Sequence, residues 1–192
     1  MNTIISETYR QLNKQLHDLR PDYGSYGKRW ADMAIGMVLE KKAQSFLDYG
    51  CGKQTLSRVM GWKWRMELGS PYPLKLVDYD PALPGLDATP EPADVVFCTD
   101  VLEHIEPDHL DAVLADLQRV TRNAGFLTVA TRPAVKSLPD GRNAHLIQKP
   151  WYWWAEKIDH VFVVNVCEPA DGMEVRFWIE ARPQPAKNGA MS

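Results

Sequence analysis

The chain has 192 residues, 45% of them hydrophobic and 24% charged, and its 22 basic and 25 acidic residues leave a formal net charge of −3. This length fits one domain, and the slight acidity gives no electrostatic support for binding to nucleic acid or anionic lipid, although it does not exclude them. Because no apolar run approaches the roughly 20 residues that span a bilayer, and residues 1–20 are too polar for a signal peptide, we expect a cytoplasmic protein without a membrane segment.

The three cysteines, Cys51, Cys98 and Cys167, show no C-x-x-C spacing. An odd number of irregularly spaced cysteines predicts neither a disulfide framework nor a structural zinc site. We therefore expect no bound metal. The composition leaves the oligomeric state open.

The chain begins with two expected helices, over residues 3–20 and 29–42, where apolar residues recur at helical spacing and Pro21 stops the first pattern. A loop at 23–27, rich in glycine and tyrosine, lies between them. This loop has two interpretations: a lid over a bound ligand, or a plain connection into the second helix.

A short buried strand over residues 45–49 runs into Gly50-Cys51-Gly52, and a helical pattern resumes at residues 55–60. A glycine turn between a strand and a helix lets a ligand lie against the backbone, and the start of the helix offers unpaired N–H groups. The pattern is typical of the opening of a nucleotide-binding α/β unit. A tight turn without a ligand remains the alternative.

Residues 61–73 are expected to form a loop, and residues 74–79 a second strand that ends in Asp78-Tyr79-Asp80. The two aspartates lie on one face of an extended strand because side chains alternate. A carboxylate at this place in such sheets accepts hydrogen bonds from ribose hydroxyls. We favour Asp80, which is nearer the carboxyl end, with Asp78 as the alternative; either aspartate could instead cap the turn before Pro81.

Four prolines within residues 81–92 predict an extended loop. Residues 94–99 then form an apolar strand of the kind buried in a parallel sheet. This strand delivers Asp100, Glu103 and His104 to the carboxyl edge of the sheet, where open α/β sheets bind ligands.

The next pattern predicts a helix over residues 107–120 that ends before Asn123-Ala124-Gly125, followed by a strand over 126–130 and a polar loop over 131–149. An aromatic helix is expected over 150–158. A hairpin of strands 161–166 and 174–179 and a disordered tail over 182–192 complete the chain. Alternating strands and helices predict a three-layer αβα sandwich with a Rossmann-like, mostly parallel sheet and a C-terminal antiparallel hairpin. Residues 1–181 form one domain in this interpretation, with N-terminal helices in residues 1–44.

Three motifs occur in one order: D-Y-G-C-G at residues 48–52, Y-D-P at 79–81 and D-V-V-F-C-T-D-V-L-E-H-I at 94–105. Together they resemble the class I S-adenosylmethionine-dependent methyltransferases, in particular the small-molecule group with D-V-L-E-H-I after the fourth strand. The resemblance implies S-adenosylmethionine as the cofactor and transfer of a methyl group to an oxygen or nitrogen atom of a metabolite, sugar or lipid-linked acceptor.

The resemblance also implies roles for individual residues. The methionine part of the cofactor is bordered by Asp48, Gly50, Cys51 and Gly52; the ribose is bound by Asp80 or Asp78; the adenine lies near Asp87 and Ala88; and the sulfonium is flanked by Asp100 and Val101.

The chain departs from the family pattern at two places. Gln54 stands where the glycine motif usually has a third small residue. The short stretch between Asp80 and Asp87 has no room for the helix and third strand of the family, so we expect one strand–helix unit to be shortened or missing.

Methyl transfer from a sulfonium requires mainly alignment of nucleophile, methyl group and sulfur in a dry site. A base is needed only if the acceptor loses a proton, and the candidates are His104 and His145. Structural packing is the alternative for His104, and an ordered surface loop is the alternative for His145. We expect the clustered tryptophans to form part of the acceptor wall, although Trp151 and Trp154 share a helix face that would more often pack on the sheet.

Two other functions remain open at this point. One is methylation of a nucleobase or nucleic acid, and the other is a cofactor-binding interaction protein without turnover.

Overall fold

The computed structural model describes residues 3–182. The helices are α1 (Glu7–Leu19), α2 (Ala31–Lys41), α3 (Thr55–Met66), α4 (Leu110–Val120) and α5 (Trp151–Val161), with short 3₁₀ helices η1 (Tyr26–Trp30), η2 (Leu102–His104) and η3 (Pro107–His109). The strands are β1 (Ser45–Tyr49), β2 (Lys75–Tyr79), β3 (Ala93–Thr99), β4 (Thr121–Ala130), β5 (Phe162–Ala170) and β6 (Glu174–Ala181).

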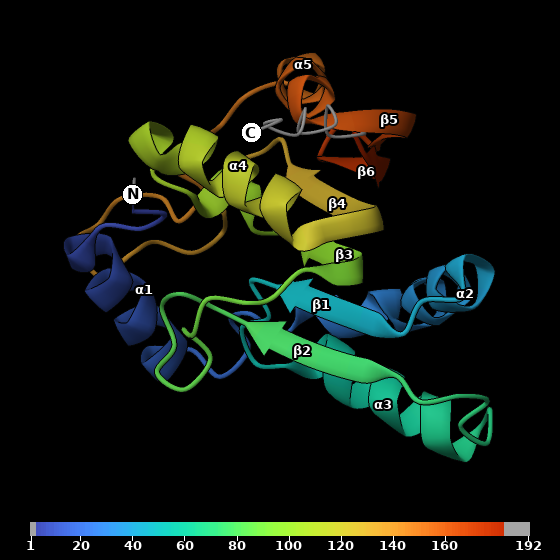
Figure 1. Ribbon diagram of the computed structural model, residues 1–192. Helices are drawn as coiled ribbons and strands as arrows, with labels where there is room; N and C mark the ends of the chain where they lie inside the picture. Colours follow the sequence, from blue (N-terminus) through green and yellow to red (C-terminus); the bar gives the residue numbers. More distant parts are fainter. Residues whose placement is uncertain (1–2, 183–192) are drawn as a thin grey trace, which may run out of the picture.

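The strands form one six-stranded sheet in the order β2-β1-β3-β4-β6-β5 (Figure 1). The first four strands are parallel, with Phe46 opposite Val95 and Cys98 opposite Leu127. Strand β6 runs antiparallel between β4 and β5. The expected mostly parallel sheet with a C-terminal antiparallel hairpin is confirmed.

The expected gap in the fold lies between β2 and β3. Residues 81–92 contain neither a helix nor a strand, and β2 is left at the edge of the sheet. Prolines at four positions explain why, because each removes a backbone donor and restricts the residue before it. One strand–helix unit is therefore missing, and a loop crosses from β2 to β3 in its place.

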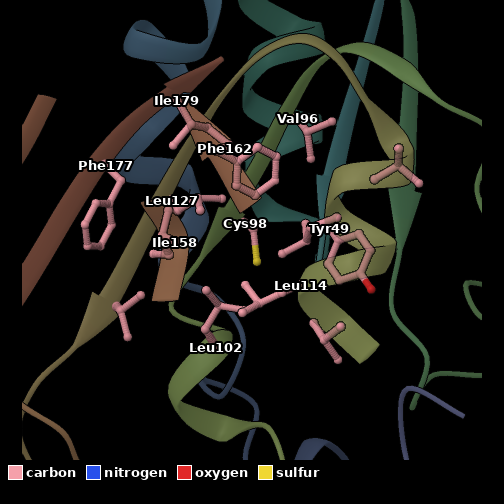
Figure 2. Packing of buried hydrophobic residues seen from close by; sticks show 14 of the residues in the cluster. Tyr49, Val96, Cys98, Leu102, Leu114, Leu127, Ile158, Phe162, Phe177 and Ile179 are labelled. Carbon is pink, nitrogen blue, oxygen red and sulfur yellow. The ribbon is translucent and has the colours of Figure 1, made fainter. Parts of the chain in front are cut away.

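Helices cover both faces of the sheet. Helices α2 and α3 pack on one face through a cluster that includes Ala34, Val38, Leu56 and Met60, against Phe46, Val95, Phe97 and Phe126 of the strands. Helices α4 and α5 pack on the other face. Figure 2 shows part of that second core, where Tyr49, Val96, Cys98 and Leu127 of the sheet meet Leu114 and Ile158 of the helices. The result is the predicted three-layer sandwich.

Helix α1 lies near the end of the sheet toward which the arrowheads of β1 and β2 point (Figure 1). Its first turn is capped by Ser6, whose Oγ accepts a hydrogen bond from the backbone N–H of Tyr9 at 3.1 Å. Apolar residues of the N-terminal segment pack against the loops after β2 and β4, in a cluster that joins Ile5, Tyr9 and Leu16 to Ala82, Leu138 and Ala144. The segment thus covers the carboxyl ends of the parallel strands.

The expected boundaries of α3 and β4 are wrong. Helix α3 continues to Met66 instead of ending near residue 60, because Trp64 is buried against the sheet and its ring contacts Tyr72 with centroids 5.1 Å apart. Residues Asn123-Ala124-Gly125 belong to β4 rather than to a helix end. A side chain at Gly125 would approach the Val96 carbonyl oxygen of β3 to 2.7 Å, so the glycine permits close strand pairing instead of breaking a helix.

The hairpin strands are longer than predicted, with β5 reaching Ala170. The predicted disordered tail at 182–192 lies, except for Arg182, outside the described residues. Within residues 3–182, no helix combines the length and the apolar character needed to cross a membrane.

Candidate active site

A cavity of about 510 Å³ lies at the carboxyl edge of the parallel strands, beneath α1. Its wall is formed by the glycine turn after β1, the ends of β2 and β3, the N-terminal segment, the loop after β4 and the turn between β5 and β6. Ligands of open α/β sheets bind at this edge. Of the predicted site residues, the cavity is lined by Gly50, Gly52, Asp80, Asp100, Val101, His104 and His145.

The glycine turn closes onto the loop that precedes η1. Gly52 has φ +50°, and a Cβ atom there would lie 2.7 Å from the carbonyl oxygen and 2.8 Å from the Cα of Gly24. The N–H of Lys53 donates to the same carbonyl oxygen at 2.9 Å. Gly50, at φ +79°, would place a Cβ atom against the side chain of Val101. The backbone conformation and the close approach both require glycine here.

Asp80 both lines the cavity and stabilises its turn. One carboxylate oxygen accepts from the N–H of Gly52 at 3.1 Å, and the other accepts from the N–H of Ala82 at 3.0 Å. Burial raises the pKa of Asp80, and these two backbone donors oppose the increase. Asp80 therefore caps the turn, and because it also lines the cavity, the prediction that it binds the ribose remains compatible with this role.

Asp78 points elsewhere. Its Oδ2 accepts hydrogen bonds from Gln54 Nε2 at 3.1 Å and Ser57 Oγ at 2.9 Å, both at the start of α3, and Asp78 does not line the cavity. Gln54 adopts φ +57° and directs its side chain to this aspartate. The unusual residue in the glycine motif therefore leaves the cavity open, and Asp80 is the better placed of the two acids.

Asp48 and Cys51 are buried beside the glycine turn without lining the cavity. Burial, together with the negative charges of Asp78 and Asp80, raises the pKa of Asp48 to about 8. Burial also raises the pKa of the Cys51 thiol. Cys51 contributes through its backbone, since its N–H donates to the Tyr79 carbonyl oxygen at 3.0 Å.

Asp87 is not brought to the cavity. Its side chain is exposed, accepts a hydrogen bond from the N–H of Gly85 at 3.1 Å and lies 3.8 Å from Arg10 Nη1. The neighbouring Ala88 is also exposed. The adenine contacts expected of this pair stay a prediction.

Asp100 and Val101 stand directly after β3. Asp100 adopts φ +62°, a conformation uncommon for residues other than glycine, while its N–H donates to the carbonyl oxygen and the hydroxyl of Thr128 on β4 at 3.1 and 3.0 Å. Strand pairing thus holds the backbone in this conformation. Both residues line the cavity, and their place beside the sulfonium stays a prediction.

The two candidate histidines meet in the cavity wall. The rings of His104 and His145 have centroids 4.7 Å apart and are nearly perpendicular. Nδ1 of His104 lies 2.8 Å from the Ala144 carbonyl oxygen, and Nδ1 of His145 lies 2.7 Å from that of Arg132. Because a carbonyl oxygen only accepts, each neutral ring carries its proton on Nδ1 and leaves Nε2 as an acceptor.

Burial lowers the pKa of both imidazoles, that of His104 to about 4. The rings are therefore neutral at physiological pH.

Glu103 is a further polar group at this place. Its side chain is fully buried, and its Oε1 accepts from the N–H of Ala130 at 2.7 Å. Its Oε2 has no hydrogen-bond partner among the described residues. Burial, followed by the charge of Asp100, raises the pKa of Glu103 well above its ordinary value. Sequence reasoning placed Glu103 at this edge but assigned it no role.

Sequence reasoning missed most of the N-terminal contribution to the site, which consists of Ile4, Ile5, Tyr9, Asn13, His17, Asp22, Tyr23, Gly24, Tyr26 and Arg29. The signal was the loop at 23–27, for which a lid was one interpretation. Tyr23 lies between two histidines: its ring is 4.6 Å from that of His17, and its hydroxyl is 3.3 Å from Nδ1 of His104. Burial lowers the pKa of His17 to about 4.

The tryptophan prediction is wrong. No tryptophan lines the cavity within residues 3–182. Trp64 and Trp154 belong to the cores on opposite faces of the sheet, whereas Trp62 and Trp151 are 53% and 45% exposed. Trp151 therefore does not share the burial of Trp154, because helix α5 presents only the Trp154 side to the sheet.

A glycine turn, acids after β2 and β3 and a covered cavity at the carboxyl edge define a ligand-binding α/β protein of the Rossmann-like class. Residues 10–167 match the model of a family described as a methyltransferase domain. Since the match spans most of the sequence, the chain belongs to this methyltransferase family. The resemblance to class I S-adenosylmethionine-dependent methyltransferases is thereby confirmed, and with it the enzyme class and its cofactor, S-adenosylmethionine.

Solved structures show the same fold. The 1,6-didemethyltoxoflavin-N1-methyltransferase of Burkholderia thailandensis is 14% identical with a TM-score of 0.60, over 95% of this chain and 94% of that chain. The DhpI–SAH complex is 15% identical with a TM-score of 0.54, over 91% and 97% of the two chains. The PH0226 protein of Pyrococcus horikoshii OT3 is 14% identical with a TM-score of 0.53, over 88% and 99%. No curated protein matches the sequence.

Proposed function

We propose that this enzyme transfers the methyl group of S-adenosylmethionine to an oxygen or nitrogen atom of a small molecule bound beside His145 and His104. The observation that carries the proposal is a single cavity that joins the glycine turn, Asp80 and Asp100 to the two imidazoles. One part of this cavity suits the methyl donor and the adjoining part suits the acceptor. The donor supplies an electrophilic methyl group on a positively charged sulfur.

The charge of the first part favours a cationic ligand. Asp80 and Asp100 line the cavity, and Asp48 is buried just behind the turn. Burial, followed by the negative charges of Asp78 and Asp80, raises the pKa of Asp48. The carboxylates gathered here attract a sulfonium or an ammonium group. The turn itself has room for a ligand against its backbone only because positions 50 and 52 lack a Cβ atom.

The second part supports proton removal from an acceptor. Nε2 of His104 and of His145 is free to accept a proton, as the hydrogen bonds of both Nδ1 atoms indicate. The low pKa of His104 keeps its ring unprotonated and ready, although it also makes the ring a weak base. Residues of α1 and of the loop at 23–27 line the same cavity and cover part of it, which favours transfer in a site with limited access to water.

The size and the charge of the cavity favour a small acceptor. A volume of about 510 Å³ is in the range of small-molecule sites and has to hold the donor as well. Of the four cationic side chains that line it, all but Arg132 pair with carboxylates: Lys136 Nζ lies 2.6 Å from Asp22, Arg176 Nε lies 2.8 Å from Glu174, and Arg29 also pairs with Glu174. Three of the four cations are thus engaged, which speaks against a nucleic-acid acceptor. The Burkholderia thailandensis structure holds 1,6-didemethyltoxoflavin and S-adenosylhomocysteine, in agreement with this size class.

Calorimetric titration with S-adenosylmethionine tests the donor site. We expect wild-type protein to bind one equivalent, and Gly52→Arg to lose binding because the side chain fills the turn and collides with the backbone of Gly24. Gly69→Arg is the matched control, since Gly69 also has a positive φ, +66°, but nothing lies within 4 Å of its Cβ position. Unchanged affinity in Gly52→Arg would refute the donor site.

The acceptor site is tested by transfer of a labelled methyl group to a panel of small hydroxyl- and amine-bearing molecules. We expect His145→Ala to lower turnover while its affinity for S-adenosylmethionine stays at the wild-type value. Turnover equal to that of the wild type would remove His145 from the site.

A further inference from the structure

Glu103, His104 and His145 bring three metal-binding donors together: the two histidines line the cavity, whereas Glu103 is buried and does not line it. One ligand atom from each lies within 4.8 Å of the others. Ligands around a tetrahedral first-row cation lie about 3.4 Å apart, since each bond is about 2.0–2.2 Å long. The cluster therefore needs a contraction of up to about 1.4 Å to hold a cation. The three residues come from two segments that are far apart in the sequence, η2 and the loop after β4.

The second observation is the unpartnered oxygen of Glu103. The side chain is 0% exposed, and Oε2 has no hydrogen-bond partner among residues 3–182, whereas Oε1 is held by the N–H of Ala130. A buried carboxyl oxygen without a partner is costly and needs an explanation. A cation beside it satisfies this oxygen, and the Ala130 hydrogen bond then fixes the orientation of the ligand.

Both imidazoles are already oriented as ligands. Metal-binding histidines usually donate the other ring N–H to a carbonyl or carboxylate oxygen, which fixes the tautomer. His104 and His145 do so through Nδ1, to the carbonyl oxygens of Ala144 and Arg132 at 2.8 and 2.7 Å. Both rings therefore present an unprotonated Nε2, and the hydroxyl of Tyr23 supports His104 from the side at 3.3 Å.

The open side of the cluster is the cavity. His104, His145 and the nearby Asp100 line the cavity, so ligands can enter from the acceptor part. Two imidazoles and one or two carboxylates suit Zn²⁺, Mn²⁺, Fe²⁺ or Co²⁺, and three protein ligands leave positions for other oxygens.

We propose that Glu103, His104 and His145 bind a divalent first-row transition-metal cation, and that this cation positions a hydroxyl group of the acceptor. The sequence analysis predicted no bound metal, and this proposal departs from that prediction. The cation site itself is independent of the proposed function, whereas the role in positioning the acceptor rests on it.

This role narrows the acceptor to a hydroxyl-bearing molecule. A divalent cation lowers the pKa of a bound hydroxyl group, so the proton passes to water without a strong protein base. The acceptor oxygen then forms a bond to the methyl carbon while the carbon–sulfur bond breaks and its electron pair stays on sulfur. Products are the methyl ether, neutral S-adenosylhomocysteine and the released proton. In this arrangement the two histidines act as ligands, and the low basicity of His104 ceases to be an obstacle.

Metal-free protein titrated with Co²⁺ or Zn²⁺ in a calorimeter tests the site. We expect one cation per chain, with affinity reduced by at least about tenfold in both Glu103→Gln and His145→Gln. Glu103→Gln keeps an oxygen to accept the Ala130 hydrogen bond, so its fold is retained. His160→Gln, an exposed histidine on α5, is the matched control and should bind as the wild type does. X-ray absorption of the Zn²⁺ complex of the wild type should show two imidazole ligands, a readout that needs no variant.

The proposal is overturned if the wild type binds no stoichiometric cation, if neither variant weakens binding, or if the absorption spectrum lacks imidazole ligands. Calorimetry with S-adenosylhomocysteine on metal-free protein separates this result from the proposed function. Normal binding of S-adenosylhomocysteine without a cation site refutes only the present inference. Absence of S-adenosylhomocysteine binding refutes the donor site whatever the metal result.

Discussion

Replacement of Gly52 by alanine is expected to disrupt the contact between the glycine turn and the N-terminal segment. The added Cβ atom would lie 2.7 Å from the carbonyl oxygen and 2.8 Å from the Cα of Gly24, distances that real Cβ contacts do not show. Both neighbours are backbone atoms, which cannot rotate away as a flexible side chain can. The loop at 23–27 must therefore move, and with it Tyr23 and the cover of the cavity.

The size of the effect has two parts. A residue other than glycine at φ +50° costs about 1 kcal/mol relative to glycine. Displacement of the loop also loses the hydrogen bond from Lys53 N–H to the Gly24 carbonyl oxygen, a further loss of about 1 kcal/mol. Gly52→Ala should thus lower the free energy of unfolding by about 2 kcal/mol or more.

Urea denaturation of Gly52→Ala and Gly69→Ala provides the measurement. Gly69 has φ +66° with nothing within 4 Å of its Cβ position, so its alanine variant reports the backbone penalty alone. We expect Gly52→Ala to be destabilised by at least about 1 kcal/mol more than Gly69→Ala, and its S-adenosylhomocysteine affinity to fall as well. Equal destabilisation of the two variants, with wild-type affinity in both, would show that the Gly24–Gly52 contact does not support the site.

Three further predictions follow from particular contacts. Because the pKa of Asp48 is about 8 in the free protein and its charged form attracts a sulfonium, affinity for S-adenosylmethionine should rise as pH increases through about 8. Asp48→Asn should remove that rise. Calorimetric titration of both proteins over a pH series measures it, and the same rise in both would contradict the prediction. Trp154→Ala should lower the free energy of unfolding by about 3–5 kcal/mol in urea denaturation, since the ring is 0% exposed, whereas Trp151→Ala should change it by no more than about 0.5 kcal/mol. Ser6→Ala should remove about 1 kcal/mol by deleting the cap of α1 and the hydrogen bond to Glu106 Oε1 at 2.7 Å; wild-type amide-hydrogen exchange in α1 would contradict this.

Local sequence determined most of the sheet and its glycine turn. Continuous apolar runs such as Val95-Val96-Phe97-Cys98 are typical of strands buried on both faces. Gly50 and Gly52 follow another buried strand, and this local order is enough to predict a glycine turn. The missing strand–helix unit was also predictable, because four prolines within residues 81–92 exclude regular structure there. These features depend only on residues that are neighbours in the sequence, so the sequence alone was sufficient to predict them.

Element ends were decided by tertiary packing. Gly125 occurs in a pattern typical of a helix end, yet the close approach of Val96 on β3 makes the same glycine a strand residue. Trp64 likewise extends α3 because it finds a buried place against the sheet. Local preference is weak compared with the burial of a large side chain, and burial depends on what lies opposite.

Only the tertiary structure decided which polar residues share the cavity. Asp78 and Asp80 lie on one strand face, but the hydrogen bonds from Gln54 and Ser57 turn Asp78 toward α3 and leave Asp80 at the ligand edge. Glu103 and His145 meet because β3 and β4 end side by side. Sequence therefore predicted the class of enzyme and its glycine turn, while the fold selected the side chains that line the cavity, because that selection depends on contacts between segments that are distant along the chain.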